Sequence, residues 1–131
     1  MLPALPVLAG EATEVRELFA RLAEALSTSS ATDFLGPFDR RMPGFARLER
    51  QVFALLNQFE VASSVELVGD QGDSGKRAVE VDWMLELRSL AATGPAERRR
   101  QVLKVTLERR GQAWRITALE PVDFFAPPPP R

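Results

Sequence analysis

Apolar residues recur at helical spacing in the first part of the chain. In the segment EATEVRELFARLAEALS, residues 11–27, they form one face made of Val15, Leu18, Phe19, Leu22 and Leu26. A repeat of three to four positions is typical of an amphipathic helix. The segment therefore predicts a helix that begins after Gly10, with Glu14 and Glu17 early enough to favour the positive end of the helix dipole.

A second helical stripe runs through PGFARLERQVFALLNQFE, residues 43–60. Its apolar face consists of Phe45, Leu48, Val52, Leu55, Leu56 and Phe59. Pro43 stands near the start, where a missing backbone N–H costs least. Between the two helices, the sequence predicts a short helical turn around Phe34, with Ser30 and Thr32 as caps.

From residue 61 onward the apolar residues alternate with polar ones. This period of two predicts strands, and turns bearing Gly or Pro divide the remainder into about four of them. The predicted strands are VASSVELV (61–68), RAVEVDWMLELRSL (77–90), ERRRQVLKVTLERR (97–110) and AWRITALEP (113–121). Each connection is short enough for an antiparallel neighbour.

Alternation also assigns faces within the predicted strand 77–90. Asp82 precedes Trp83, and an acid beside an indole is a pattern found at active sites. In a strand, however, successive side chains point to opposite faces. Trp83 therefore shares the buried face with its apolar neighbours, whereas Asp82 lies on a polar outer face with Glu80, Met84, Glu86 and Arg88.

The last predicted hairpin has a testable register. If Gly111 and Gln112 form a two-residue turn, Glu108 faces Arg115 and Leu107 faces Ile116, while Thr106 faces Thr117. The same register sets Arg109 opposite Trp114, where the guanidinium can stack on the indole or lie beyond the core at a strand end.

Helices followed by antiparallel strands predict an α+β domain, with N-terminal helices packed in the concave face of a curved antiparallel sheet of about four strands. The element order, the link FLGPFDRRMPGF (34–45) and the closing WRITALEP (114–121) resemble the nuclear transport factor 2-like superfamily, also described as SnoaL-like or cystatin-like cone folds. The resemblance runs from about residue 11 to 125. We expect an N-terminal extension (1–10), a single nuclear transport factor 2-like domain (11–125) and a Pro-rich tail (126–131).

The resemblance implies an apolar pocket between the helices and the concave face, and an outer sheet face that pairs subunits. The superfamily includes isomerases, dehydratases, polyketide cyclases and many non-catalytic domains. Its ketosteroid isomerases use a tyrosine in the oxyanion hole, and its dehydratases depend on histidine and tyrosine. This chain contains neither residue type.

Composition narrows the function further. The 131 residues include no Cys or His, which removes thiolate and imidazole metal ligands and the commonest general base. A net charge of -1 gives no overall field that would attract nucleic acid, and no stretch has the roughly 20 apolar residues of a membrane span. We expect no cofactor and no metal. Localisation stays open: cytoplasmic if Met1 is native, periplasmic or secreted if a leader has been removed.

A carboxylate raised in pKa by an apolar pocket can still move protons. The candidates are Asp33, Asp39 and Asp123, which flank apolar clusters, although such positions are also ordinary caps and turns. The loop GDQGDSGK (69–76) departs from the phosphate-loop spacing and is interpreted as a hairpin loop, and ERRRQ (97–101) as a solvated charge run.

Our interpretation is a non-catalytic nuclear transport factor 2-like domain that binds either a small hydrophobic ligand or a partner protein. The candidate ligand-binding lining is Phe34, Phe38, Phe45, Phe59, Trp83 and Trp114. A homodimer through the outer sheet face is expected. The alternative is an isomerase- or cyclase-like enzyme that uses a pocket carboxylate without His or Tyr.

Overall fold

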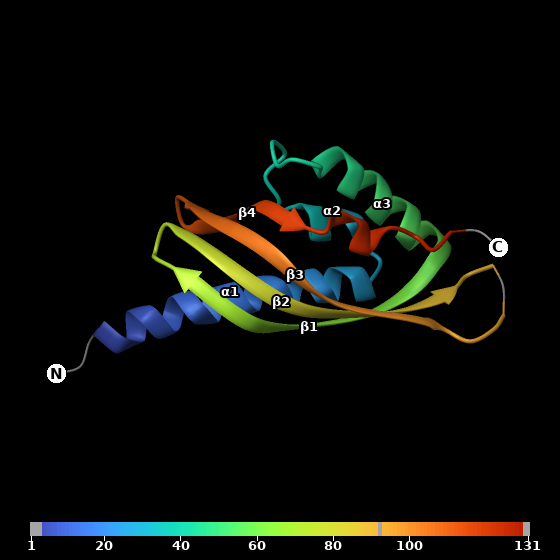
Figure 1. Ribbon diagram of the computed structural model, residues 1–131, viewed down its shortest axis with the longest axis horizontal. Helices are drawn as coiled ribbons and strands as arrows, with labels where there is room; N and C mark the ends of the chain where they lie inside the picture. The colour runs from blue at the N-terminus through green and yellow to red at the C-terminus, as the bar shows by residue number, and fades with distance from the viewer. Residues whose placement is uncertain (1–3, 92, 130–131) are drawn as a thin grey trace.

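The computed structural model describes residues 4–91 and 93–129, with side chains from Gly10 onward. Three helices precede four strands: α1 (Ala4–Ser27), α2 (Ala31–Leu35), α3 (Phe45–Gln58), β1 (Phe59–Gly72), β2 (Lys76–Ser89), β3 (Glu97–Arg110) and β4 (Ala113–Glu120), followed by the 3-10 helix η1 (Val122–Phe125). The strands form one curved antiparallel sheet in the order β1-β2-β3-β4, with the helices on one side (Figure 1). The α+β architecture predicted from the sequence is confirmed.

The first helix begins earlier than the sequence pattern suggested. It starts at Ala4 rather than after Gly10, so it includes part of the expected N-terminal extension. Pro6 is tolerated because it falls in the first turn, where backbone N–H groups have no intrahelical partner. The first turn carries no acidic residue, so the expected contribution of Glu14 and Glu17 to the helix dipole was wrong. Residues 1–3 of the extension and 130–131 of the Pro-rich tail lie outside the described residues.

The second and third helices follow the sequence more closely. Ser30 caps α2 by accepting a hydrogen bond from the backbone N–H of Asp33 at 3.2 Å. The buried face of α3 consists of Phe45, Leu48, Val52 and Leu55. Phe59 is not on this helix face as expected, because the helix ends at Gln58 and Phe59 already has extended backbone as the first residue of β1.

The register of the last hairpin is confirmed for three pairs. Leu107 lies opposite Ile116, Glu108 opposite Arg115, and Arg109 opposite Trp114. The expected pairing of Thr106 with Thr117 was wrong, because the register shifts there and Thr106 lies opposite Ala118. One extra residue in β4 produces this irregularity.

The faces of β2 alternate as predicted. Its inward side chains are all at most 2% exposed: Val79, Val81, Trp83, Leu85 and Leu87. They pack against the inward residues of β3 and the apolar face of α1, including Leu18, Phe19 and Leu22, in one hydrophobic core. Asp82 lies on the opposite face of the sheet, among hydrogen-bonding partners described below.

Candidate functional site

The interior between helices and sheet is occupied by a cluster of aromatic rings. Trp83 from β2 contacts Phe19 of α1 and Phe34 of α2, each at 6.2 Å between ring centroids, and Phe125 of η1 at 5.1 Å. Phe34 also packs on Phe38 at 5.3 Å. Edge-to-face and tilted contacts at these distances are favourable between aromatic rings. The rings therefore lie in contact with one another in the region where the family resemblance implied a pocket.

The structure brings together three of the six candidate lining residues, Phe34, Phe38 and Trp83. Phe45 is buried near the start of α3, with the Arg40 guanidinium 5.8 Å from its ring centroid. Phe59 is half-buried at the start of β1.

Two members of the aromatic cluster were not among the predicted lining residues. Phe19 lies on the apolar stripe of α1, and Phe125 lies directly before the Pro-rich tail. The helical stripe could have identified Phe19, whereas no local periodicity marks Phe125.

The cluster contains one polar contact. The indole nitrogen of Trp83 donates a hydrogen bond to Ser63 Oγ of β1 at 2.8 Å. Among the residues whose side chains the structure describes, no charged or polar residue is classed as buried. The described part of the interior therefore has almost no group that could orient a polar substrate or transfer a proton.

The three candidate carboxylates lie outside this interior. Asp33 is exposed on α2, and exposed Asp123 accepts hydrogen bonds from Arg47 at 2.9 Å and Gln51 at 2.8 Å. Asp39 is partly exposed, and its pKa is held below the ordinary value by the backbone N–H of Arg41 and then by Arg110. Charge-assisted hydrogen bonds of this kind favour the ionised carboxylate.

Asp82 is engaged on the outer face of the sheet. Arg100 Nε donates to Asp82 Oδ1 at 3.1 Å, and Arg100 Nη2 donates to Oδ2 at 2.7 Å. These hydrogen bonds lower the pKa of the Asp82 carboxyl. Asp82 thus lies on the outer face, as the alternation of faces had indicated, and forms a cross-strand ion pair with Arg100.

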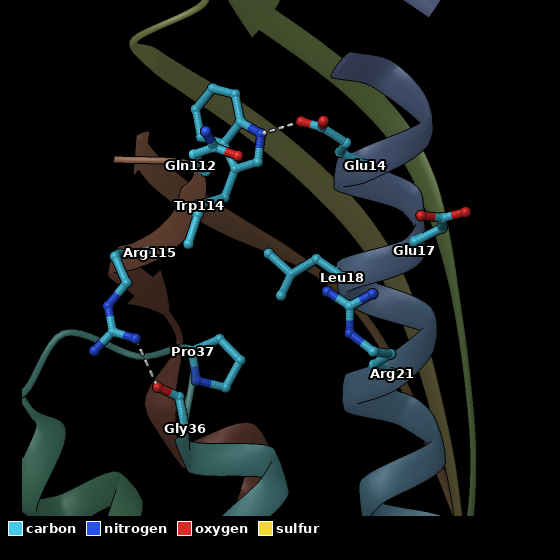
Figure 2. Close-up of a pocket in the computed structure, with 10 residues that line it drawn as sticks. Glu14, Glu17, Leu18, Arg21, Gly36, Pro37, Gln112, Trp114 and Arg115 are labelled. Atoms are coloured by element: carbon cyan, nitrogen blue, oxygen red, sulfur yellow. Dashed lines mark hydrogen bonds between the residues drawn. The ribbon is translucent and has the colours of Figure 1, made fainter. Parts of the chain in front are cut away.

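An open pocket lies between α1 and the β3–β4 hairpin (Figure 2). It has a volume of about 460 Å³, and its lining comes from three segments: Glu14, Glu17, Leu18 and Arg21 of α1, Gly36 and Pro37, and Gln112 to Arg115. Trp114 is the one candidate lining residue among the ten that border this pocket.

At one side of this pocket, Glu14, Arg109 and Trp114 contact one another. Glu14 Oε1 accepts hydrogen bonds from Arg109 Nη2 at 2.7 Å and from Trp114 Nε1 at 3.2 Å. The Arg109 guanidinium lies 4.7 Å from the Trp114 ring centroid, so of the two possibilities that the hairpin register left open, the structure has the guanidinium over the indole. The hydrogen bonds from Arg109, and after it from Trp114, lower the pKa of Glu14.

Within residues 4–91 and 93–129, no group of three His, Cys, Asp or Glu residues is arranged to hold a metal ion. None of the helices found there has the length and apolar character needed to cross a membrane.

Comparison with known proteins gives structural matches only. No family model matches the chain, and no curated protein matches it in sequence. Among solved structures, a protein from Novosphingobium aromaticivorans DSM 12444 that is provisionally named a scytalone dehydratase is similar with a TM-score of 0.77 and 9% identity, covering 88% of this chain and 85% of the other.

Two further solved structures have the same architecture. A nuclear transport factor 2-like protein with a cystatin-like fold, from Novosphingobium aromaticivorans, matches with a TM-score of 0.67 and 15% identity over 88% of this chain and 83% of its own. A protein from Xanthomonas campestris is provisionally named a calcium/calmodulin-dependent protein kinase II association domain. It matches with a TM-score of 0.61 and 16% identity, over 81% of this chain and 82% of its own. At these identities the matches show a shared fold, which is the one that the element order resembled.

Proposed function

We propose that this chain, which has the nuclear transport factor 2-like fold, is a non-catalytic assembly domain that pairs with a second copy of itself through the outer face of its sheet. The packing of the interior carries the non-catalytic part of the proposal, and the outer sheet face carries the pairing. Phe34, Trp83 and Phe125 occupy the space in which a ligand or substrate would otherwise sit. The sequence left two kinds of binding partner open, a small hydrophobic ligand and a protein. This packing favours the protein.

The alternative, an enzyme that works through a carboxylate alone, has less support. Such a mechanism needs an acid desolvated inside the pocket and close to the substrate. The candidates Asp33, Asp39 and Asp123 instead lie at the surface, and Asp39 is further stabilised in its charged form.

The outer sheet face has an apolar centre. Met84 of β2 is 42% exposed and Val102 of β3 is 49% exposed, and they lie two rows apart on the same face of the β2–β3 ladder. Exposed apolar residues at the middle of a polar surface are typical of the core of a protein interface.

Charges of both signs surround this centre. Toward the β2–β3 loop lie Arg98 and Arg100, which remain 77% and 70% exposed although each is paired with an acid. Toward the other end lies one base, Lys104 of β3. It is opposite an acid on each neighbouring strand, Glu80 of β2 and Glu120 of β4. Because both signs are present, a two-fold axis through the apolar centre can set the exposed Arg98 and Arg100 of one copy against acids of the other.

Assembly is also the role named for one structurally similar protein, the association domain from Xanthomonas campestris. That likeness concerns the fold, and the pairing of this chain is proposed from its own outer face.

Sedimentation equilibrium of the full chain, at concentrations on the order of tens of micromolar, tests the proposal. We expect a dimer for the parent and a monomer for Val102→Lys, because the substitution places a charge in the apolar centre. Phe53→Lys is the matched control, since Phe53 is 46% exposed but lies on α3. A monomeric parent, or equal dissociation of the two variants, would overturn the pairing.

A further inference from the structure

The pocket between α1 and the β3–β4 hairpin contains one cation without a partner. Arg21 has no hydrogen bond or ion pair with any other residue that the structure describes. Figure 2 shows its guanidinium turned toward Leu18 and the space between the elements, while the carboxylate of Glu17 points away from that space. A guanidinium presents five N–H donors in a planar fork, so Arg21 has its full hydrogen-bonding capacity available to a ligand.

Two other charged groups on the lining, Arg115 and Glu14, are already engaged, and the Glu17 carboxylate points away from the space (Figure 2). Arg115 donates from Nη1 to the carbonyl oxygen of Gly36 at 2.9 Å, and from Nη2 to that of Phe38 at 3.3 Å. Glu14 accepts from both Arg109 and Trp114 through Oε1. Arg21 is therefore the cation on the pocket lining that has no partner among the described residues.

The remaining lining is largely apolar and comes from different parts of the chain. Leu18 of α1 and Trp114 of β4 are buried residues whose edges border the space, and the ring of Pro37 borders it from below in the view of Figure 2. The volume of about 460 Å³ lies within the range of small-molecule sites, roughly 300 to 1,000 Å³. Because three separate segments of the chain surround the space, its shape suits a compact molecule better than an extended polypeptide.

We propose that this pocket binds a small organic monocarboxylate, with the carboxylate on Arg21 and a flat apolar group against Trp114, Pro37 and Leu18. A carboxylate matches the guanidinium fork with two parallel hydrogen bonds. A doubly charged phosphate is disfavoured because Glu14 and Glu17 line the same pocket. The site lies away from the filled interior and from the outer sheet face, so it does not depend on the proposed pairing.

The two tryptophans provide a direct test by nuclear magnetic resonance. The indole N–H of Trp114 lies at this pocket, whereas that of Trp83 lies in the interior bonded to Ser63. The ¹⁵N-labelled full chain would be titrated with 3-phenylpropionate and with 2-naphthoate, each up to about 10 mM, and with the uncharged amide of each acid. We expect a saturable shift of the Trp114 indole signal, no shift of the Trp83 signal, and binding of the amides at least about tenfold weaker.

Two arginine variants complete the test. Arg21→Gln should weaken binding of the acids by at least about tenfold, because it removes the charge-assisted hydrogen bonds. Arg16→Gln, an exposed position on the same helix outside the pocket lining, should bind as the parent does. The rest of each spectrum reports whether the variant is folded.

The outcomes separate this proposal from the proposed function. Absence of a saturable Trp114 shift with both acids, or equal binding by the parent and Arg21→Gln, would overturn the carboxylate site and leave the outer-face pairing untouched. A shift of the Trp83 signal instead would place the ligand in the interior, which contradicts both this site and the filled interior.

Discussion

The indole nitrogen of Trp83 donates a hydrogen bond to the hydroxyl oxygen of Ser63 at 2.8 Å, from the second strand to the first. The two residues lie on the same inward face, two pairs apart along the ladder, since Trp83 is opposite Val65 and Ser63 is opposite Leu85. Trp83 is fully buried, so Ser63 supplies the partner that its N–H would otherwise obtain from water. This contact fixes the largest side chain of the core in one orientation.

Ser63→Ala should leave that N–H unsatisfied and lower the free energy of unfolding by about 1–3 kcal/mol. Ser64→Ala is the matched control, because Ser64 is exposed on the opposite face of β1 and should change stability little. Urea unfolding of the two variants beside the parent gives the comparison. Equal effects at the two positions would contradict the assigned role of Ser63.

Trp83→Ala should be more severe and lower the free energy of unfolding by about 3–5 kcal/mol, because it empties a large buried site. Asp82→Asn should have a much smaller effect, since it removes one charge from an ion pair with an exposed arginine. Both values come from the same urea measurement. If Asp82→Asn proved clearly more stable than the parent, the enzyme alternative would gain support, because catalytic acids are often retained at a cost in stability.

The contact of Glu14 with Arg109 and Trp114 should make stability depend on pH. A carboxyl whose pKa is lowered on folding adds stability above its unfolded pKa, and loses that contribution as the pH falls through the folded value. We therefore expect Glu14→Gln to be less stable than the parent at pH 7, with the difference shrinking below about pH 4.

The control for this prediction is Glu17→Gln, one turn along the same helix and without a hydrogen-bond partner among the described residues. Thermal unfolding of the three proteins between pH 3 and pH 7, read by circular dichroism, would measure the effect. A difference between parent and Glu14→Gln that stays constant across this range would show that the charge of Glu14 is not the cause.

The turn between β1 and β2 depends on a glycine. Gly72 has φ of +140°, and a Cβ placed there would come within 2.3 Å of the carbonyl oxygen of Lys76. Gly72→Ala should therefore lower the free energy of unfolding by about 1–3 kcal/mol. Gly75→Ala, where the nearest atom would be Asp73 Oδ1 at 3.6 Å, should be close to neutral in the same urea experiment, and a loss of equal size there would refute the steric argument.

The sequence predicted best what depends on alternation along a strand. The opposite faces of Asp82 and Trp83, and the pairing of Leu107 with Ile116, both follow from a period of two combined with a short turn. The pairing of Thr106 failed because an extra residue in β4 leaves no mark in the hydrophobic pattern. Glu108 faces Arg115 as predicted, but the Arg115 guanidinium donates to the carbonyl groups of Gly36 and Phe38, which the strand pattern does not reveal.

The candidate sites were harder to predict because they depend on contacts between distant segments. Aromatic residues in the sequence indicated an apolar interior. Whether that interior is filled depends on the volume of the rings compared with the space between the helices and the sheet, which the sequence does not give. Phe125 completes that filling from beyond the last strand, and no local pattern identifies it. Arg21 lies on the polar side of α1 in the sequence, and only the approach of Pro37 and Trp114 gives it a pocket.

The short bridge between Phe38 and Ile116 covers part of the outer edge of β4. Ile116 donates its backbone N–H to the carbonyl oxygen of Pro37 and accepts from the N–H of Asp39, at 2.9 and 2.8 Å. An uncovered edge is a template on which strands of other molecules can add. If the segment around Phe38 detaches during partial unfolding, β4 becomes such a template, so the bridge also protects the chain against aggregation.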